Sequence, residues 1–248
     1  MIILKSDLEI EKIRKSSQLA VKALEVVKEK ISEGVTLKKL DKICYKFITQ
    51  QGAIPAFLGY KGFPASICTS VNFEVVHGIP GNRRLVSGDI ISIDLGVLLD
   101  GYYGDVAATF PVDHVSDLAR RLLQTTEEAL YKGIEACRVG NRLSDISYAI
   151  QSTAERYGFS VVREFVGHGI GRSMHEDPQV PNFGEPGKGV RLKPGMVLCL
   201  EPMVNAGGWE TEVMDDGWTV ITKDRSLSCH FEHTVAITKD GSEILTQS

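Results

Sequence analysis

The chain has 248 residues, of which 43% are apolar and 24% are charged, the proportions of an ordinary globular protein. Its formal net charge is -4, and it contains no long run of basic residues. These features argue against a nucleic-acid partner or an anionic membrane surface, so we expect neither.

The amino terminus and the cysteines predict a cytoplasmic protein. The apolar start Met1–Leu4 is too short for a signal-peptide core, and no later stretch could span a bilayer. The five cysteines are scattered and odd in number, with no C-x-x-C pair, so reduced thiols are expected rather than a disulfide framework. We interpret four as small core residues, namely Cys44, Cys137, Cys199 and Cys229.

The first half of the chain predicts two helices followed by two strands. Ser6-x-x-Glu9 forms a capping box at the start of a helix, and a second amphipathic helix runs from Leu37 to Gln51. The apolar runs Asp89–Leu99 and Tyr102–Phe110 are typical of strands, and the Asp-Gly pair between them is typical of a hairpin turn.

The second half repeats this plan. Helical patterns cover Leu118–Cys137 and Leu143–Tyr157, and strand patterns cover Met196–Glu201 and Phe231–Thr238. Paired helices that alternate with hairpin-linked strands indicate the α+β class. We predict a curved antiparallel sheet covered by helices on one side.

A weak internal repeat supports a duplication. Gly34-Val35-Thr36-Leu37 resembles Gly140-Asn141-Arg142-Leu143, and the two glycines are 106 residues apart. Gly88 and Gly195 are 107 residues apart, and each is followed six positions later by an acid. A nearly constant offset predicts a single domain, 1–248, made of two pseudo-symmetric halves, approximately 1–112 and 113–248.

Four acids occupy strand positions where apolar residues are expected. If Asp100-Gly101 is the turn, Asp105 faces Gly96 across the hairpin and lies diagonally from Asp94, with Cα atoms about 7–8 Å apart. Glu201 ends the equivalent strand of the second half, and Glu232 begins the last one. Buried carboxylates of this kind require cations, and an oxygen-rich site with an imidazole suits manganese, iron, cobalt or zinc.

Three histidines lie in segments that favour a site. His77 precedes a Gly-Ile-Pro-Gly turn, His168 lies between two glycines that permit close approach of a ligand, and His175 follows seven residues later. We interpret His114, His230 and His233 as ordinary surface or core residues. His233 falls on the strand face opposite the acid that precedes it.

Taken together, these motifs resemble type I methionine aminopeptidases, in the short form without an N-terminal extension. The resemblance covers nearly the whole chain. It rests on Val76-His77-Gly78-Ile79-Pro80, Asp94 with Asp100 to Asp105, Gly167 to Gly171, His175-Glu176-Asp177-Pro178, Glu201-Pro202 and Glu232-His233-Thr234. It implies the duplicated pita-bread fold and a single peptidase domain.

The resemblance also implies residue roles. The metal ligands would be Asp94, Asp105, His168, Glu201 and Glu232, with Asp105 and Glu232 bridging two divalent ions of cobalt, manganese, iron or zinc. Glu201 would also transfer protons, His77 would contact the scissile amide, and His175 would stabilise the tetrahedral intermediate. The substrate-binding residues would be His77, His175, Tyr60, Phe63, Cys68 and Trp218.

The implied reaction is removal of the initiator methionine from nascent proteins whose second residue is small, by attack of a metal-bridging hydroxide. The implied partners are nascent polypeptide N-termini and the ribosome, with the enzyme acting as a monomer. Three alternatives remain at this point. They are an X-Pro peptidase of the same fold, a catalytically dead module that only binds peptides, and a structural carboxylate cluster paired with basic residues.

Overall fold

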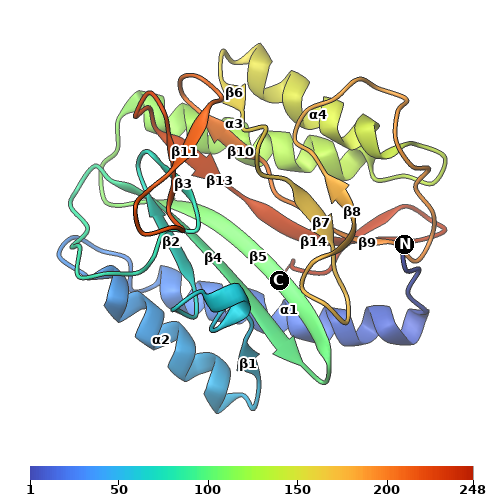
Figure 1. The fold of residues 1–248 in the computed structure, drawn as a ribbon, viewed down its shortest axis with the longest axis horizontal. Helices are drawn as coiled ribbons and strands as arrows, with labels where there is room; N and C mark the ends of the chain where they lie inside the picture. Colours follow the sequence, from blue (N-terminus) through green and yellow to red (C-terminus); the bar gives the residue numbers. More distant parts are fainter. Residues whose placement is uncertain (248) are drawn as a thin grey trace.

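Two pairs of helices lie against a curved antiparallel sheet in the computed structural model, which describes residues 1–247 (Figure 1). The helices are α1 (Asp7–Lys28), α2 (Leu37–Gln50), α3 (Asp117–Ala136) and α4 (Leu143–Arg156), with a 3-10 turn at Tyr60–Gly62. The predicted capping box is present, because Ser6 and Glu9 each accept a hydrogen bond from the other's backbone N–H. The first helix begins where predicted, and the other three predicted helices are confirmed to within one residue at each end.

The main sheet follows the order β1-β4-β5-β14-β9-β7-β8, with β2 also paired to β4 and β15 to β14. Its strands are β1 (Ile54–Pro55), β2 (Cys68–Val71), β4 (Ile90–Leu99), β5 (Tyr102–Pro111), β7 (Gly167–Gly169), β8 (Glu176–Val180), β9 (Val197–Leu200), β14 (Glu232–Ile237) and β15 (Ser242–Ile244). Two small sheets contain β3 (Glu74–Val76), β6 (Ser160–Val161), β10 (Met203–Asn205), β11 (Thr211–Val213), β12 (Val220–Thr222) and β13 (Ser228–His230).

The strand order is symmetric about its middle. Reading outward from the β5–β14 contact, β4 and then β2 follow on one side, and β9 and then β7 follow on the other. This arrangement agrees with the predicted pseudo-twofold fold. The division of the chain near residues 112 and 113 stays a prediction.

Strand alternation separates the core from the opposite face of the sheet. Ile91, Ile93 and Val106 pack under α1 and α2. Leu198 and Val235 belong to the cluster under α3 and α4. Burial of such side chains stabilises each half by roughly 1.5–3 kcal/mol per residue. The intervening residues of the same strands point away from the helices and are free to form a site.

The two halves meet at the contact of β5 with β14, which we call the seam. Direct pairing there covers Glu232 with Ala107 and the following His233 with Val106. The Thr234 hydroxyl extends the contact, because its Oγ1 donates to the Asp105 carbonyl at 2.8 Å and accepts from the Asp105 N–H at 3.3 Å. A side-chain hydroxyl therefore continues a short backbone ladder.

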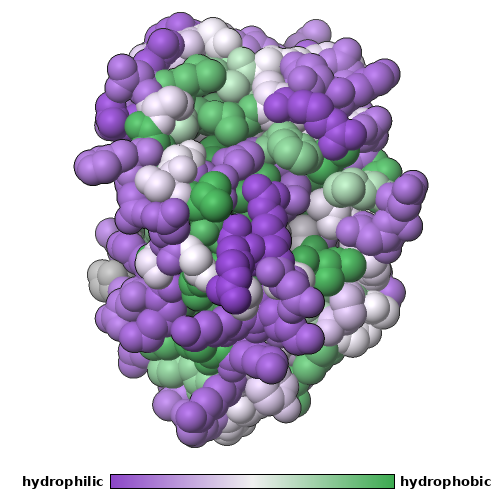
Figure 2. Space-filling model, turned by 90° about the vertical axis from the view of Figure 1, so that its left-hand side faces the viewer, coloured by the Kyte–Doolittle hydropathy of each residue, from purple (hydrophilic) through white to green (hydrophobic). Residues whose placement is uncertain are grey.

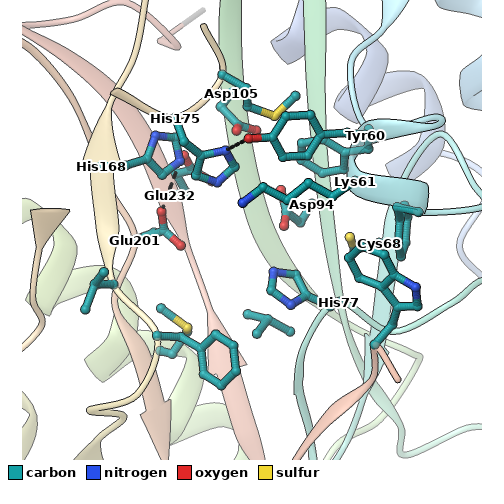
Figure 3. A pocket seen from close by; sticks show the side chains of 18 of the residues that line it. Tyr60, Lys61, Cys68, His77, Asp94, Asp105, His168, His175, Glu201 and Glu232 are labelled. Atoms are coloured by element: carbon teal, nitrogen blue, oxygen red, sulfur yellow. Dashed lines mark hydrogen bonds and ion pairs between the residues drawn. The ribbon is translucent and has the colours of Figure 1, made fainter. Parts of the chain in front are cut away.

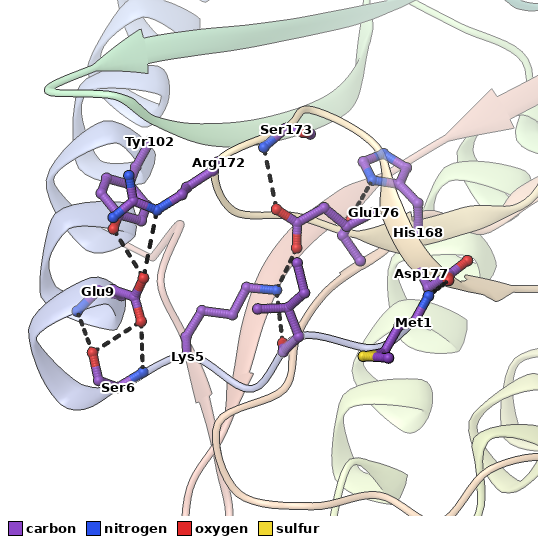
Figure 4. A network of polar contacts seen from close by, with 12 residues as sticks. Met1, Lys5, Ser6, Glu9, Tyr102, His168, Arg172, Ser173, Glu176 and Asp177 are labelled. Atoms are coloured by element: carbon purple, nitrogen blue, oxygen red, sulfur yellow. Dashed lines mark hydrogen bonds and ion pairs between the residues drawn. The ribbon is translucent and has the colours of Figure 1, made fainter.

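The first residues of the chain are anchored to the second half (Figure 4). The Lys5 N–H donates to the Gly195 carbonyl at 2.7 Å. The Lys5 ammonium lies 2.6 Å from a carboxylate oxygen of Glu176, and these side chains are 3% and 8% exposed. Glu176 directly follows His175 in the chain, so this buried ion pair ties the start of the chain to the His175 loop.

On the face drawn in Figure 2, hydrophilic side chains predominate and hydrophobic ones form small separate groups. Within residues 1–247, no helix has both the length and the apolar character needed to cross a bilayer.

Candidate active site

The hairpin of β4 and β5 has the register that the sequence predicts. Asp94 pairs with Ala107, and Gly96 pairs with Asp105. Glu232 of β14 pairs with Ala107 from the other side. Because directly paired residues share a face, the carboxylates of Asp94, Asp105 and Glu232 all emerge on the sheet face opposite the helices.

The second half adds its donors to the same face. His168 of β7 pairs with Cys199 of β9, which in turn pairs with Thr234 of β14. Glu201 lies two residues beyond Cys199, so it returns to the face of His168. The His168 Nε2 lies 3.5 Å from Glu201 Oε1. Figure 3 shows the four carboxylates turned toward a common space with His168 beside them.

Burial and mutual repulsion govern the electrostatics of this cluster. Burial raises the pKa of Asp105 to about 7. Burial, followed by the charge of Asp105, raises the pKa of Asp94 and Glu232 well above their usual range, and the pKa of Glu201 rises through burial and the charge of Asp94. Burial lowers the pKa of His168 to about 4, so its imidazole is neutral at pH 7.

These donors fit a divalent cation. Asp94 Oδ1 and Glu232 Oε1 are buried without any hydrogen-bond partner. Carboxylates that repel one another and lack donors are stabilised by a bound positive charge, and a neutral imidazole completes a suitable ligand set. This geometry argues against a structural cluster paired with basic residues, because no Lys or Arg of residues 1–247 forms a salt bridge with these acids.

One donor was missed from the sequence. Ligand atoms of Asp105, His168, Cys199 and Glu232 all lie within 4.8 Å of one another. Cys199 is fully buried, as predicted for a core residue, but its side chain lies on the face of the metal donors. The signal was its position two residues before Glu201, which alternation places on the same face.

His77 is held in an unusual backbone conformation beside the cluster. Its φ is 60°, in the left-handed region that few non-glycine residues adopt. The following Gly78 packs so closely that a Cβ there would lie 2.1 Å from the Thr69 carbonyl oxygen. This close packing fixes the direction of His77, whose pKa is lowered mainly by burial.

His175 lies directly against His168. The ring centroids are 4.1 Å apart, and His175 Nδ1 is within 2.9 Å of the Tyr60 hydroxyl. Burial, and then the nearby His168, lower the pKa of His175 to about 3. The imidazole is therefore neutral and can exchange a hydrogen bond with Tyr60 without carrying a charge.

The donors open into a cavity of about 300 Å³ with an apolar wall. Phe63 and Trp218 meet edge to face, with ring centroids 5.1 Å apart, and the buried Cys68 lies in the same cluster. Tyr60 also lines the cavity. The structure thus brings together all of the predicted metal-binding, catalytic and substrate-binding residues around one space (Figure 3).

Sequence reasoning missed other residues around this cavity. Lys61, which has a φ of 50°, lines it without belonging to any motif, as does Phe165. His230, interpreted as an ordinary residue, is buried, and its Nε2 lies 3.9 Å from Glu201 Oε2 with no hydrogen-bond partner. The predictions for exposed His114 and for His233, which contacts Thr246, agree with the structure.

Comparison with known proteins identifies the family. The model of metallopeptidase family M24 matches residues 11–239. A methionine aminopeptidase of Clostridium perfringens is 54% identical, and the match covers 99% of each chain. Methionine aminopeptidase 1 of Bacillus subtilis is also 54% identical, with the match covering 100% of each chain. The chain belongs to the methionine aminopeptidases of metallopeptidase family M24.

Solved structures agree with this family. The crystal structure of methionine aminopeptidase from Rickettsia prowazekii has a TM-score of 0.98 and 48% identity over 100% of each chain. A prolidase from Pyrococcus furiosus matches with a TM-score of 0.78 and 24% identity over 99% of this chain and 66% of the prolidase, a likeness of fold alone. The pita-bread fold and the class of metal-dependent aminopeptidase that releases methionine are therefore confirmed.

Proposed function

We propose that this protein removes the initiator methionine from nascent chains whose second residue is small, with two divalent ions at its active site. One observation carries the proposal. Four carboxylates and His168 from both halves of the sheet converge on a cavity with an apolar, sulfur-containing wall. A thiol and aromatic rings suit the thioether side chain of methionine.

The ligand set we propose contains the five donors from both halves of the fold, Asp94, Asp105, His168, Glu201 and Glu232. Asp105 and Glu232 lie on the two strands that meet at the seam, and they would hold the ions together with the three other donors. Manganese, iron, cobalt and zinc all suit such a set. When bound, the ions supply Lewis acidity that polarises a carbonyl and lowers the pKa of water.

The chain's own residues supply the proton transfers and the orientation. Glu201 accepts a proton from the attacking water and passes it to the leaving amine. His77, fixed by its tight turn, donates to the scissile amide. His175, oriented by the Tyr60 hydroxyl, stabilises the developing oxyanion with a neutral N–H.

The size of the cavity supports selectivity for the second residue. In this proposal the ions, the methionine side chain and the scissile bond all lie within one cavity of about 300 Å³, so a large second residue would compete for the same space. Tyr60 and His175, whose rings stack at a centroid distance of 5.3 Å, narrow the same space. We therefore assign nascent N-termini with small second residues as the substrate. We further propose that the enzyme acts as a monomer in the cytoplasm, at or near the ribosome.

The test is release of methionine from Met-Ala-Ser and Met-Lys-Ser by metal-stripped protein, with manganese, iron, cobalt or zinc added separately. We expect metal-dependent release from the first peptide and little from the second. Equal release from both would contradict the selectivity. Release only from X-Pro peptides would show that these peptides, and not methionyl chains, are the substrate. No release with any metal from folded protein would favour a peptide-binding module.

A further inference from the structure

Cys199 lies beneath the proposed metal centre. It is 0% exposed, and its direct pairing with His168 on one side and Thr234 on the other places its side chain on the face of the metal donors. Its Sγ makes a long contact of 3.6 Å with the Thr234 hydroxyl, and the thiol also faces the Glu232 carboxylate. No strong hydrogen bond therefore holds the thiol away from the site.

The distances suit a four-ligand site. The donor atoms of Asp105, His168, Cys199 and Glu232 lie within 4.8 Å of one another. Tetrahedral zinc with bonds of about 2.0–2.3 Å places its ligands roughly 3.4–3.8 Å apart. The four donor atoms would therefore need to approach one another by about 1 Å to complete the coordination of one ion.

A second observation points to a ligand at the same place. Glu232 Oε1 has no hydrogen-bond partner, although the residue is only 3% exposed. A carboxylate oxygen in this state is stabilised by a cation, and the neighbouring thiol determines which cations are preferred. Thiolate favours soft ions such as zinc and cadmium, whereas oxygen ligands favour manganese.

We propose that Cys199 gives this centre a second binding mode, in which one thiophilic ion is held by Cys199, His168, Asp105 and Glu232. The inference rests on the proposed function, because three of these residues belong to the proposed metal-ligand set. The thiol proton leaves to the buffer as the sulfur–metal bond forms. The four ligands of this mode do not include Glu201, and we expect cadmium or excess zinc to occupy the centre without supporting turnover.

The test follows the sulfur–metal bond directly. Metal-stripped protein is titrated with cadmium ions alone, and thiolate-to-metal charge transfer is measured in the ultraviolet. We expect a band that saturates at one cadmium ion per chain and is lost in Cys199→Thr. Cadmium affinity in that variant should fall roughly tenfold or more, while manganese affinity changes less than about twofold.

Two further variants keep the result unambiguous. Cys68→Ala removes the thiol that lines the cavity and should retain the band. Cys199→Ser provides a second substitution if Cys199→Thr does not fold, as judged by its thermal midpoint. A band that persists without Cys199, a band lost only in Cys68→Ala, or cadmium binding without any band would each overturn the proposal.

Methionine release separates this inference from the proposed function. Manganese-dependent release without a cadmium–thiolate band would refute the second binding mode and leave the proposed function intact. A Cys199-dependent band in a protein that releases no methionine with any metal would support the second binding mode and refute the proposed function.

Discussion

At the scale of single residues, Glu201 has two proposed roles, as a metal ligand and as the group that transfers protons. It lies 3.5 Å from His168 and 3.9 Å from His230, so imidazoles flank both of its oxygens. We predict that Glu201→Gln lowers kcat by about 10²–10⁴-fold, because an amide cannot accept the proton. Peptide assays with circular dichroism test this, with the exposed Glu185→Gln as the matched control. Near-normal turnover would remove Glu201 from its assigned role.

His77 carries a separate prediction. His77→Ala should lower kcat/KM by roughly ten- to a hundredfold, because it removes one hydrogen bond to the reacting amide. Metal affinity should be unchanged, since His77 is not in the proposed ligand set. Calorimetric titration with manganese checks this, and a loss of metal binding would show that His77 supports the ions instead.

The residues of the site differ in how far sequence could predict them. Asp94 and Asp105 could be placed on one face because the Asp-Gly turn fixes the hairpin register. Strand alternation could have placed Cys199 on the face of Glu201. His230 could not be assigned to the site, because its proximity to Glu201 depends on how β13 and β9 come together. Lys61 offered no local signal either, since its segment belongs to no periodic element.

At the scale of elements, the limits of three helices and of the four predicted strands followed from caps, turns and periodicity. The small sheets and the pairing of β14 with β5 did not, because pairing between distant segments is decided by the whole core. The anchoring of Lys5 to Glu176 is another such contact, formed by residues 171 positions apart.

We predict that Lys5→Met lowers the free energy of unfolding by about 3–5 kcal/mol, because it leaves the Glu176 carboxylate buried and unpaired. The double variant Lys5→Met with Glu176→Met should lose less free energy of unfolding than Lys5→Met alone, because it leaves no buried charge unpaired. Urea unfolding measures both. Arg120→Met provides the control, because it breaks the exposed pair with Asp117 and should cost less than about 1 kcal/mol. Equal losses for Lys5→Met and the control would contradict the prediction.

At the scale of the whole molecule, the acid cluster links stability to pH when metal is absent. Asp105 has a folded-state pKa of about 7, against an ordinary value of 3.8. Between these values the folded chain keeps a proton that the unfolded chain has released. This contribution to stability is therefore fully present below the ordinary value and is lost as pH rises toward 7.

Metal-free protein should accordingly lose stability relative to Asp105→Asn as pH rises from about 4 to 7. The difference should change by at most about 1.4 kcal/mol per pH unit for this proton. Urea unfolding in the presence of a chelator, repeated across this range, measures the difference. Parallel profiles for the two proteins would rule out the raised pKa, and added manganese should stabilise the original protein more than the variant.

The short seam between the halves has a consequence for which molecules can be active. Asp105 and Glu232 belong to different halves and come together where only two residue pairs and the Thr234 hydroxyl join β5 to β14. A copy in which one half has folded and the other has not would hold only part of the proposed ligand set and would bind metal weakly. Peptide cleavage is thereby restricted to molecules in which both halves have folded, so activity itself reports that folding is complete.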